Sequence, residues 1–289
     1  MGYLTDLTDE QWAWIEPIFP PQEGRGRRRT VSLPRVIDAL MYQDRTGCQW
    51  RYIPLDFPPS GTVRYYFDKW NDDGTMLEIH DCLRRAVRTQ QGREREPTAI
   101  VVDSQSVKTA EAGGERGFDG GKQIDGRKRQ IVVDTEGNLL TVVVHAANIQ
   151  DRDGVQPALT ETQELCPSVT YAWADQSYRG DVIEWAAKVL GISIEIVTRP
   201  ADQVGFQVQP RRWVVERTIA WLGRCRRLSK DVEHLAKNSA AWIYWASIQR
   251  MLRYLAPPTD QERPYTRKKA AVAAPVANRS AGALKIAGC

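Results

Sequence analysis

The chain changes character at Ala99-Ile100-Val101-Val102-Asp103, a short run of apolar, β-forming residues that ends in an aspartate. Residues 130–134 and 139–144 are two further runs of this kind, and the polar turn between them predicts a β-hairpin. Further patterns continue to residue 255, with helices expected over 153–165, 181–190, 211–230 and 240–255 and strands over 169–174 and 192–197. This order predicts an α/β fold, a mixed sheet flanked by helices.

The residues before this run have a helical pattern. Residues 8–11 form a capping box, Ser32 is expected to cap a second helix, and Ser60 opens a third that a fourth follows. Four short helices suit a small helix-turn-helix-like domain, with Arg64 and Lys69 of the third helix as candidate DNA contacts. Helical bundles that do not bind DNA share this pattern, so it leaves the function open.

Composition divides the chain into three parts. Residues 1–92 make the helical domain, and a polar linker over 90–97 leads to the α/β domain, 98–255. Residues 256–289 are rich in proline, alanine and basic residues and have no amphipathic period, which predicts a flexible basic tail.

The composition also excludes several classes of protein. Of the 289 residues, 42% are hydrophobic and 26% charged, and no run of about 18 apolar residues could span a membrane. The first residues lack the pattern of a secretory signal, so a cytoplasmic protein is expected. Five scattered cysteines and three histidines offer almost no ligands for zinc, so any bound metal should be held by oxygen.

Basic residues are concentrated in three patches although the net charge is only +4. The patches are Arg25 with Arg27, Arg28 and Arg29; Arg127, Lys128 and Arg129; and residues 211–230, where seven basic residues, including Arg212, Arg227 and Lys230, accompany one acid. Any one patch could be a solvated surface, whereas three together favour a polyanionic partner such as DNA.

Three acids are candidate metal ligands. Asp103 and Asp175 each follow a β-rich run, and the carboxyl ends of neighbouring strands can bring two such residues together. Glu216 is the one acid of the last basic patch and shares a helix side with Arg212 and Arg227. For each acid a cap, a turn or a surface ion pair is the common alternative. A turn role is expected for Asp134, and helix capping for residues 151 and 153.

Three segments weigh against those alternatives. Residues 101–108, 171–180 and 211–218 closely resemble segments of bacterial insertion-sequence transposases of the DDE type, nearest to family five of these elements. Residues 126–129, which follow Lys108 in the chain, and residues 145–148 and 226–231 match as well, all in the family order. The resemblance covers about residues 4–255.

The resemblance implies an RNase H-like catalytic domain in which Asp103, Asp175 and Glu216 bind two Mg²⁺ ions, with Mn²⁺ as a substitute. It also implies cleavage at the inverted repeats of the element, strand transfer into target DNA, a homodimer or larger assembly on DNA, and a location with the bacterial nucleoid. The candidate DNA contacts are then Arg64, Lys69, Lys108, Arg127, Lys128, Arg129, Arg212, Arg227 and Lys230.

The sequence departs from the family at three places. Position 209 is glutamine where relatives often carry tyrosine, position 223 is glycine where a basic residue is common, and larger residues follow Asp175. These departures bear on the auxiliary DNA contacts and leave the acids intact. A catalytically inactive, DNA-binding descendant of a transposase is the alternative reading of the same chain.

Overall fold

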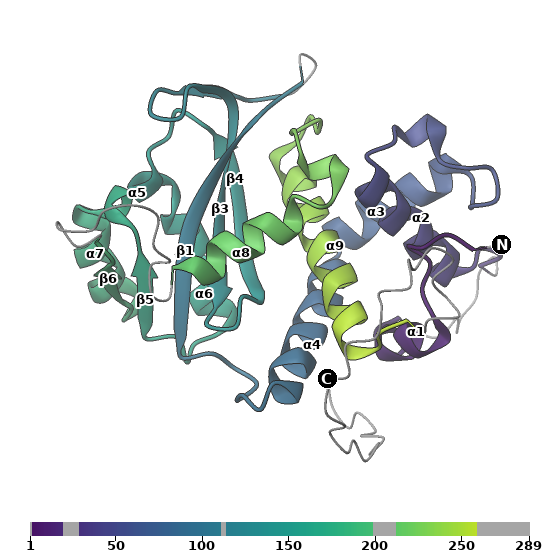
Figure 1. Ribbon diagram of the computed structural model, residues 1–289, viewed down its shortest axis with the longest axis horizontal. Helices are drawn as coiled ribbons and strands as arrows, with labels where there is room; N and C mark the ends of the chain where they lie inside the picture. Colours follow the sequence, from purple (N-terminus) through teal and green to yellow (C-terminus); the bar gives the residue numbers. More distant parts are fainter. Residues whose placement is uncertain (1, 20–28, 111–113, 199–211, 259–289) are drawn as a thin grey trace, which may run out of the picture.

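The computed structural model describes residues 2–19, 29–110, 114–198 and 212–258. Within these ranges a bundle of helices lies beside a six-stranded sheet (Figure 1). Arg25, Arg27, Arg28, Gln209, Arg211 and nearly all of the expected tail lie outside the described residues. No helix within them is both long and apolar enough to cross a membrane.

The sheet is mixed, as expected. Its strands are β1 (Ala99–Lys108), β2 (Gly117–Asp119), β3 (Ile124–Asp134), β4 (Leu139–Ala146), β5 (Tyr171–Ala174) and β6 (Ser193–Ile196). The order is β2-β3-β1-β5-β6, with β4 also paired to β3. β1 runs antiparallel to β3 and parallel to β5, and β5 runs parallel to β6. The predicted β3–β4 hairpin is confirmed.

Helices cover both faces of the sheet. On one face, α5 (Asp151–Gly154), α6 (Gln156–Leu165) and α7 (Asp181–Trp185), which continues as a π-helical turn over Ala186–Leu190, enclose an apolar cluster. On the other lie α8 (Trp213–Leu222), the short helix Arg226–Leu228 and α9 (Ala236–Leu255). This is the RNase H-like arrangement that the resemblance implies.

The helical part contains α1 (Asp9–Ile15), α2 (Leu33–Thr46), α3 (Ser60–Asp72) and α4 (Thr75–Gln90), with short 3₁₀ turns at Glu16–Ile18 and Trp50–Tyr52. The capping box of α1 is confirmed, since the side chains of Thr8 and Gln11 exchange hydrogen bonds with each other's backbone. Ser32 stands at the N-cap of α2, but its side chain makes no capping hydrogen bond.

α9 joins the two parts into one hydrophobic core. Its Trp242 is 1% exposed and stacks on Phe67 of α3 with ring centroids 4.6 Å apart. The same apolar cluster contains Ile15 of α1 and Val101 and Ile131 of the sheet. Figure 1 shows α9 between the sheet and the N-terminal helices. The last helix of the described chain therefore completes the core of the first four.

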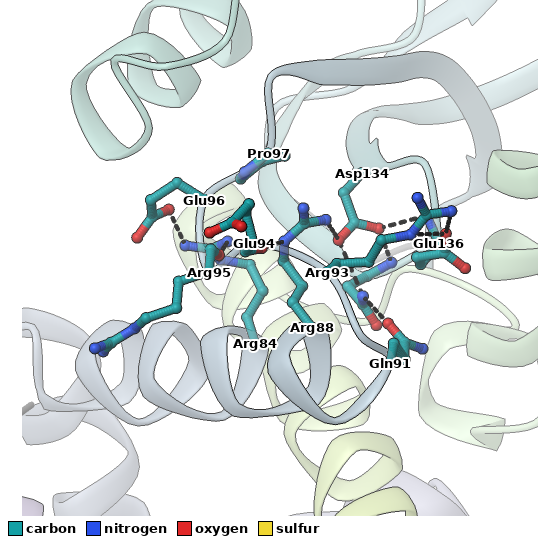
Figure 2. A network of polar contacts seen from close by, with 12 residues as sticks. Arg84, Arg88, Gln91, Arg93, Glu94, Arg95, Glu96, Pro97, Asp134 and Glu136 are labelled. Atoms are coloured by element: carbon teal, nitrogen blue, oxygen red, sulfur yellow. Dashed lines mark hydrogen bonds and ion pairs between the residues drawn. The ribbon is translucent and has the colours of Figure 1, made fainter.

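Charged side chains fix the linker between α4 and β1 (Figure 2). Buried Arg88, near the end of α4, forms an ion pair of 2.6 Å with Asp134. Asp134 is the last residue of β3 and is 0% exposed. Asp134 also accepts the backbone N–H groups of Glu136 and Asn138, so the turn role expected for it is confirmed. In the linker itself, the Glu94 carbonyl accepts a hydrogen bond of 2.8 Å from Arg88, and Arg93 pairs with Glu136 at 2.6 Å, so the linker is held against both α4 and the β3–β4 turn.

Glu96 of the linker should make stability depend on pH. Arg84 and Arg85 bind its carboxylate, and they hold its pKa at about 2, although partial burial opposes the shift. Because the folded pKa lies below the unfolded one, this stabilisation is present above about pH 4.5 and is lost as the pH falls towards 2. Glu96→Gln should therefore cost about 1–2 kcal/mol at pH 7, allowing for solvent screening, and progressively less below pH 4.5. Urea unfolding of both proteins between pH 7 and pH 3 measures the difference, and a gap that stays constant would contradict the assignment.

Several predicted boundaries are wrong. β1 does not end at Asp103 but continues to Lys108, because β3 pairs with it along its whole length. The helix expected over 211–230 ends at Leu222, and residues after Gly223 turn into a separate 3₁₀ helix. The helix expected over 153–165 begins earlier and is broken before Gln156, with Gln150 rather than an aspartate at its N-cap.

Candidate active site

The topology of the sheet brings the first two acids together. The parallel pairing of β1 with β5 ends at Val101 and Trp173, and Asp103 and Asp175 each lie two residues beyond that pair. Adjacent parallel strands have their carboxyl ends at the same edge, so both side chains reach one place. The expected convergence therefore occurs although Asp103 lies within its strand.

Glu216 reaches the same place from helix α8, outside the sheet. It lies in the first turn of α8, which packs across β1 and β3. Thr218 of α8 donates a hydrogen bond of 2.8 Å to the carbonyl of Gly137 in the β3–β4 turn. Gly137 has φ of +83°, and a Cβ there would come within 2.9 Å of the Thr218 hydroxyl. Glycine at this turn is thus needed to seat the helix that carries the third acid.

The guanidinium of Arg212 lies among the three carboxylates. One of its nitrogens is 3.8 Å from Asp103 Oδ2, 3.7 Å from Asp175 Oδ2 and 3.3 Å from Glu216 Oε1. The side chain of Arg212 is 16% exposed, whereas that of Glu216 is 48% exposed. Three acids from β1, the end of β5 and α8 are therefore gathered around one cation at the edge of the sheet.

Local hydrogen bonds orient both aspartates. Asp103 Oδ1 accepts the N–H of Ser104 at 2.7 Å, and Asp175 Oδ1 accepts the N–H of Ser177 at 2.8 Å and also its hydroxyl. The second oxygen of each carboxylate, Oδ2, is the one nearest Arg212. Each aspartate thus keeps one oxygen on its own backbone and presents the other to the centre of the cluster.

Burial raises the pKa of Asp103 to about 6, and the nearby charge of Asp175 adds to the rise. The Ser104 N–H and the positive charges of Arg212 and Lys122 act in the opposite direction. A positive charge brought close to this buried carboxylate would stabilise its ionised form.

The donor set of this cluster suits Mg²⁺, which prefers carboxylate oxygens. The cation now among them is a guanidinium, so the site already accommodates positive charge. Within the described residues, no group of three His, Cys, Asp or Glu side chains is close enough to hold one ion. Joint binding of an ion by these acids therefore requires their side chains to move closer together.

Four of the basic residues expected to touch DNA lie inside the fold. Arg127 is 1% exposed and donates to the carbonyls of Glu115, Glu233 and His234, and Lys128 is 4% exposed and pairs with Asp151 at 3.1 Å. A buried donor that is already satisfied by the protein cannot reach a phosphate without breaking those bonds.

The other two have similar surroundings. Arg129 donates to the carbonyl of Leu228, and Arg227 donates to that of Cys48, pairs with Glu233 and lies 4.4 Å from the ring of Trp242. Because the helix ends at Leu222, Arg227 does not continue the Glu216 side as expected. These four side chains are committed to contacts within the fold.

The remaining candidates are at the surface. Lys108 and Lys230 are exposed. Arg64 pairs with Asp68 at 2.7 Å, one turn further along α3, and Lys69 pairs with Asp73, which directly follows this helix. Such exposed pairs are worth about 0–1 kcal/mol, so they do not prevent contact with DNA.

Two further side chains lie near the acids. Tyr178, three positions after Asp175, is buried and donates a hydrogen bond of 2.8 Å to Gln130 of β3. Lys122, in the turn between β2 and β3, donates to the carbonyl and hydroxyl oxygens of Ser104. The sequence signal for Lys122 was slight, since a polar, glycine-rich loop is usually solvated surface.

A mixed sheet with helices on both faces and three carboxylates at one edge fits the class of protein expected from the resemblance, an RNase H-like domain of the DDE type. Comparison with family models agrees. The model described as "Transposase DDE domain" matches residues 94–249, and "Putative transposase of IS4/5 family" matches residues 7–80. The first match covers more than half of the chain, which therefore belongs to the DDE transposase family.

Individual relatives are shorter matches. The chain is 31% identical over 127 residues to the "Putative transposase for insertion sequence element IS402" of Burkholderia cepacia, covering 41% of this chain and 59% of that protein. It is 26% identical over 117 residues to the "Insertion element IS402 uncharacterized 16.2 kDa protein" of the same organism, covering 38% and 78%. "Uncharacterized protein y4sN" of Sinorhizobium fredii is 28% identical over 118 residues, covering 40% and 87%.

Proposed function

We propose that this chain is a DNA transposase that cuts DNA at the ends of an insertion sequence and joins the freed ends to target DNA. The observation that carries the proposal is the gathering of Asp103, Asp175 and Glu216 around one cation, just beyond the last pairing of β1 with β5. Membership of the DDE transposase family supports the substrate class. DNA is therefore the proposed partner, and Mg²⁺ the proposed metal.

The reaction has two phosphodiester steps. In the first, a water oxygen bonds to phosphorus, the P–O3′ bond breaks, and a 3′-hydroxyl is left at the element end. In the second, that hydroxyl bonds to a phosphorus of the target, whose own 3′ oxygen leaves with a proton. Two bound Mg²⁺ ions would supply the charge that activates the attacking oxygen and stabilises the leaving one. No covalent bond to the protein is formed.

The chain's own residues hold the site in shape. Asp103 and Asp175 are each oriented by a hydrogen bond to one carboxylate oxygen, which leaves the other oxygen facing the cluster. Glu216 supplies the third carboxylate from a separate helix, α8. Arg212 keeps the three negative charges together before metal binds and then becomes free for a DNA phosphate. The exposed Lys108, Lys230, Arg64 and Lys69 are proposed to contact the backbone of the duplex.

Incubation with a plasmid that contains the gene and its flanking DNA tests the proposal directly. The purified chain should nick that plasmid with Mg²⁺ or Mn²⁺, and EDTA should stop the reaction. End-labelled products should carry a 3′-hydroxyl, and a precleaved end should be joined to a second DNA. Binding of DNA with no nicking under any of these conditions would favour the inactive descendant instead.

The place of Arg212 leads to a separate prediction. Arg212→Gln should bind Mg²⁺ more tightly than the wild type in the absence of DNA, because it removes a cation that competes for the same carboxylates. Charges about 4 Å apart at a protein surface interact by roughly 4 kcal/mol, and screening at this partly exposed site reduces that. We expect a gain of about 10-fold in Mg²⁺ affinity, measured by titration calorimetry.

The matched control is Lys188→Gln, which removes an exposed cation that pairs with Glu184 instead. It should leave Mg²⁺ affinity unchanged. If Arg212→Gln bound Mg²⁺ no better than this control, the guanidinium would not compete for the metal position.

A further inference from the structure

The turn between β2 and β3 is attached to the strand that carries the first acid. Asp119, at the end of β2, is buried; its Oδ1 accepts the N–H groups of Gly121 and Lys122 at 3.0 Å each. Its Oδ2 accepts the hydroxyl of Ser106 in β1 at 2.6 Å. One buried carboxylate therefore shapes the turn and fastens it to β1.

This attachment places the side chain of Lys122 against Ser104, the residue that follows Asp103. The ammonium of Lys122 lies 3.2 Å from the carbonyl oxygen of Ser104 and 3.3 Å from its hydroxyl. Ser104 is the next residue after Asp103 and donates its N–H to that carboxylate. Lys122 thus lies one residue from the proposed metal ligand, at the level where β1 has passed its last pairing with β5.

The ammonium of Lys122 keeps a hydrogen-bond donor that its contacts with Ser104 do not occupy. An ammonium has three N–H donors, of which Ser104 takes two, and the residue is exposed. Asp119 bonds the backbone of Lys122, and the nearby Asp151 pairs with Lys128 at 3.1 Å. An exposed ammonium with a free N–H donor at the edge of this acidic site can form a charge-assisted hydrogen bond to a phosphate.

We infer that Lys122 is a further DNA-contacting residue of this site, whose ammonium binds a phosphate of the strand lying across Asp103. The inference rests on the proposed function for the location of that strand. Lysine binds phosphate as a flexible point charge, so it can hold the strand while the bond beside it is broken. The buried Asp119 prepares this contact by fixing the turn before DNA arrives.

The experiment compares Lys122→Gln, Lys122→Arg and the control Lys188→Gln in the full chain. Three quantities are measured for each: the thermal unfolding midpoint, the salt dependence of affinity for a random-sequence duplex, and kcat and KM of Mg²⁺-dependent nicking. Lys122→Gln should flatten the plot of log affinity against log salt by about 0.9, the value for one phosphate contact. It should also lower nicking by about 10²-fold, the scale of losing one preorganised charged donor.

Lys122→Arg should restore the salt slope and most of the nicking, since it keeps the charge, and Lys188→Gln should resemble the wild type in all three measurements. An unchanged salt slope for Lys122→Gln would overturn the inference, whether or not its unfolding midpoint falls. A fall in the midpoint alone would show that the lysine only braces Ser104. If the wild type does not nick DNA, the proposed function fails, while the salt slope still decides the role of Lys122.

Discussion

Asp103→Asn, Asp175→Asn and Glu216→Gln should each reduce Mg²⁺-dependent nicking and strand transfer by more than about 100-fold, because loss of a metal ligand costs at least as much as loss of its supporting partners. The amides keep the size of each side chain and remove the charge that attracts a hard cation. Since Arg212 now lies among these carboxylates, each change also releases part of its ion pairing. Gel assays of plasmid nicking and of joining of a precleaved end measure the two steps separately.

The matched control is Asp153→Asn, an exposed aspartate near the start of α5. It should cut DNA at the wild-type rate. Affinity of the three acid variants for DNA without metal should stay within a few-fold of wild type. A variant that nicks normally with Mg²⁺ would remove its residue from the proposed ligand set, whatever the other two do.

Arg127→Met should lower the free energy of unfolding by about 3–5 kcal/mol, the usual result of removing one partner of a buried ion pair. Its guanidinium, 1% exposed, donates to three backbone carbonyls and lies 3.3 Å from Asp231, which is itself 1% exposed. The substitution strands that carboxylate and those carbonyls in the interior. Urea unfolding at pH 7 measures the loss.

Lys188→Met, at the surface of the same domain, should change stability by no more than about 0.5 kcal/mol. The two possible roles of Arg127 predict different results. A structural role lowers stability, whereas a DNA contact would lower affinity and the salt slope in a protein of normal stability. The second result would restore the role that the sequence first suggested for this residue.

The sequence predicted the fold class well because its signals were local. Two apolar, β-forming runs and the turn chemistry between them located the β3–β4 hairpin, and the capping box of Thr8 and Gln11 located α1. Asp175 was placed correctly at the end of a strand. The strand carrying Asp103 was predicted too short, because its second half is polar and is held by pairing with β3, a contact that no short window of sequence contains.

Charge patterns were less informative than apolar ones. A run such as Arg127-Lys128-Arg129 looks the same whether it faces solvent or is buried against carbonyls and acids far away in the chain. Several partners of Arg127 and Arg129 lie about a hundred residues later, in the segment 228–234, so the burial of the two side chains could not be foreseen. Lys122 was overlooked for the converse reason, because its position depends on Asp119 and on strand β1.

The insertion of α9 among the first four helices has a consequence for how the protein is made. Gln90 leaves the ribosome long before Leu255, and at bacterial rates of synthesis the interval is on the order of 10–30 s. During that time Phe67 of α3 lacks its stacking partner Trp242, and the surfaces of α2 and α4 that pack on α9 are uncovered. A nascent chain with an exposed apolar surface is open to chaperones and proteases, and a message broken before α9 yields a product that cannot bury it. Expression of such an element would then depend on complete translation, which links the supply of active protein to the integrity of the whole gene.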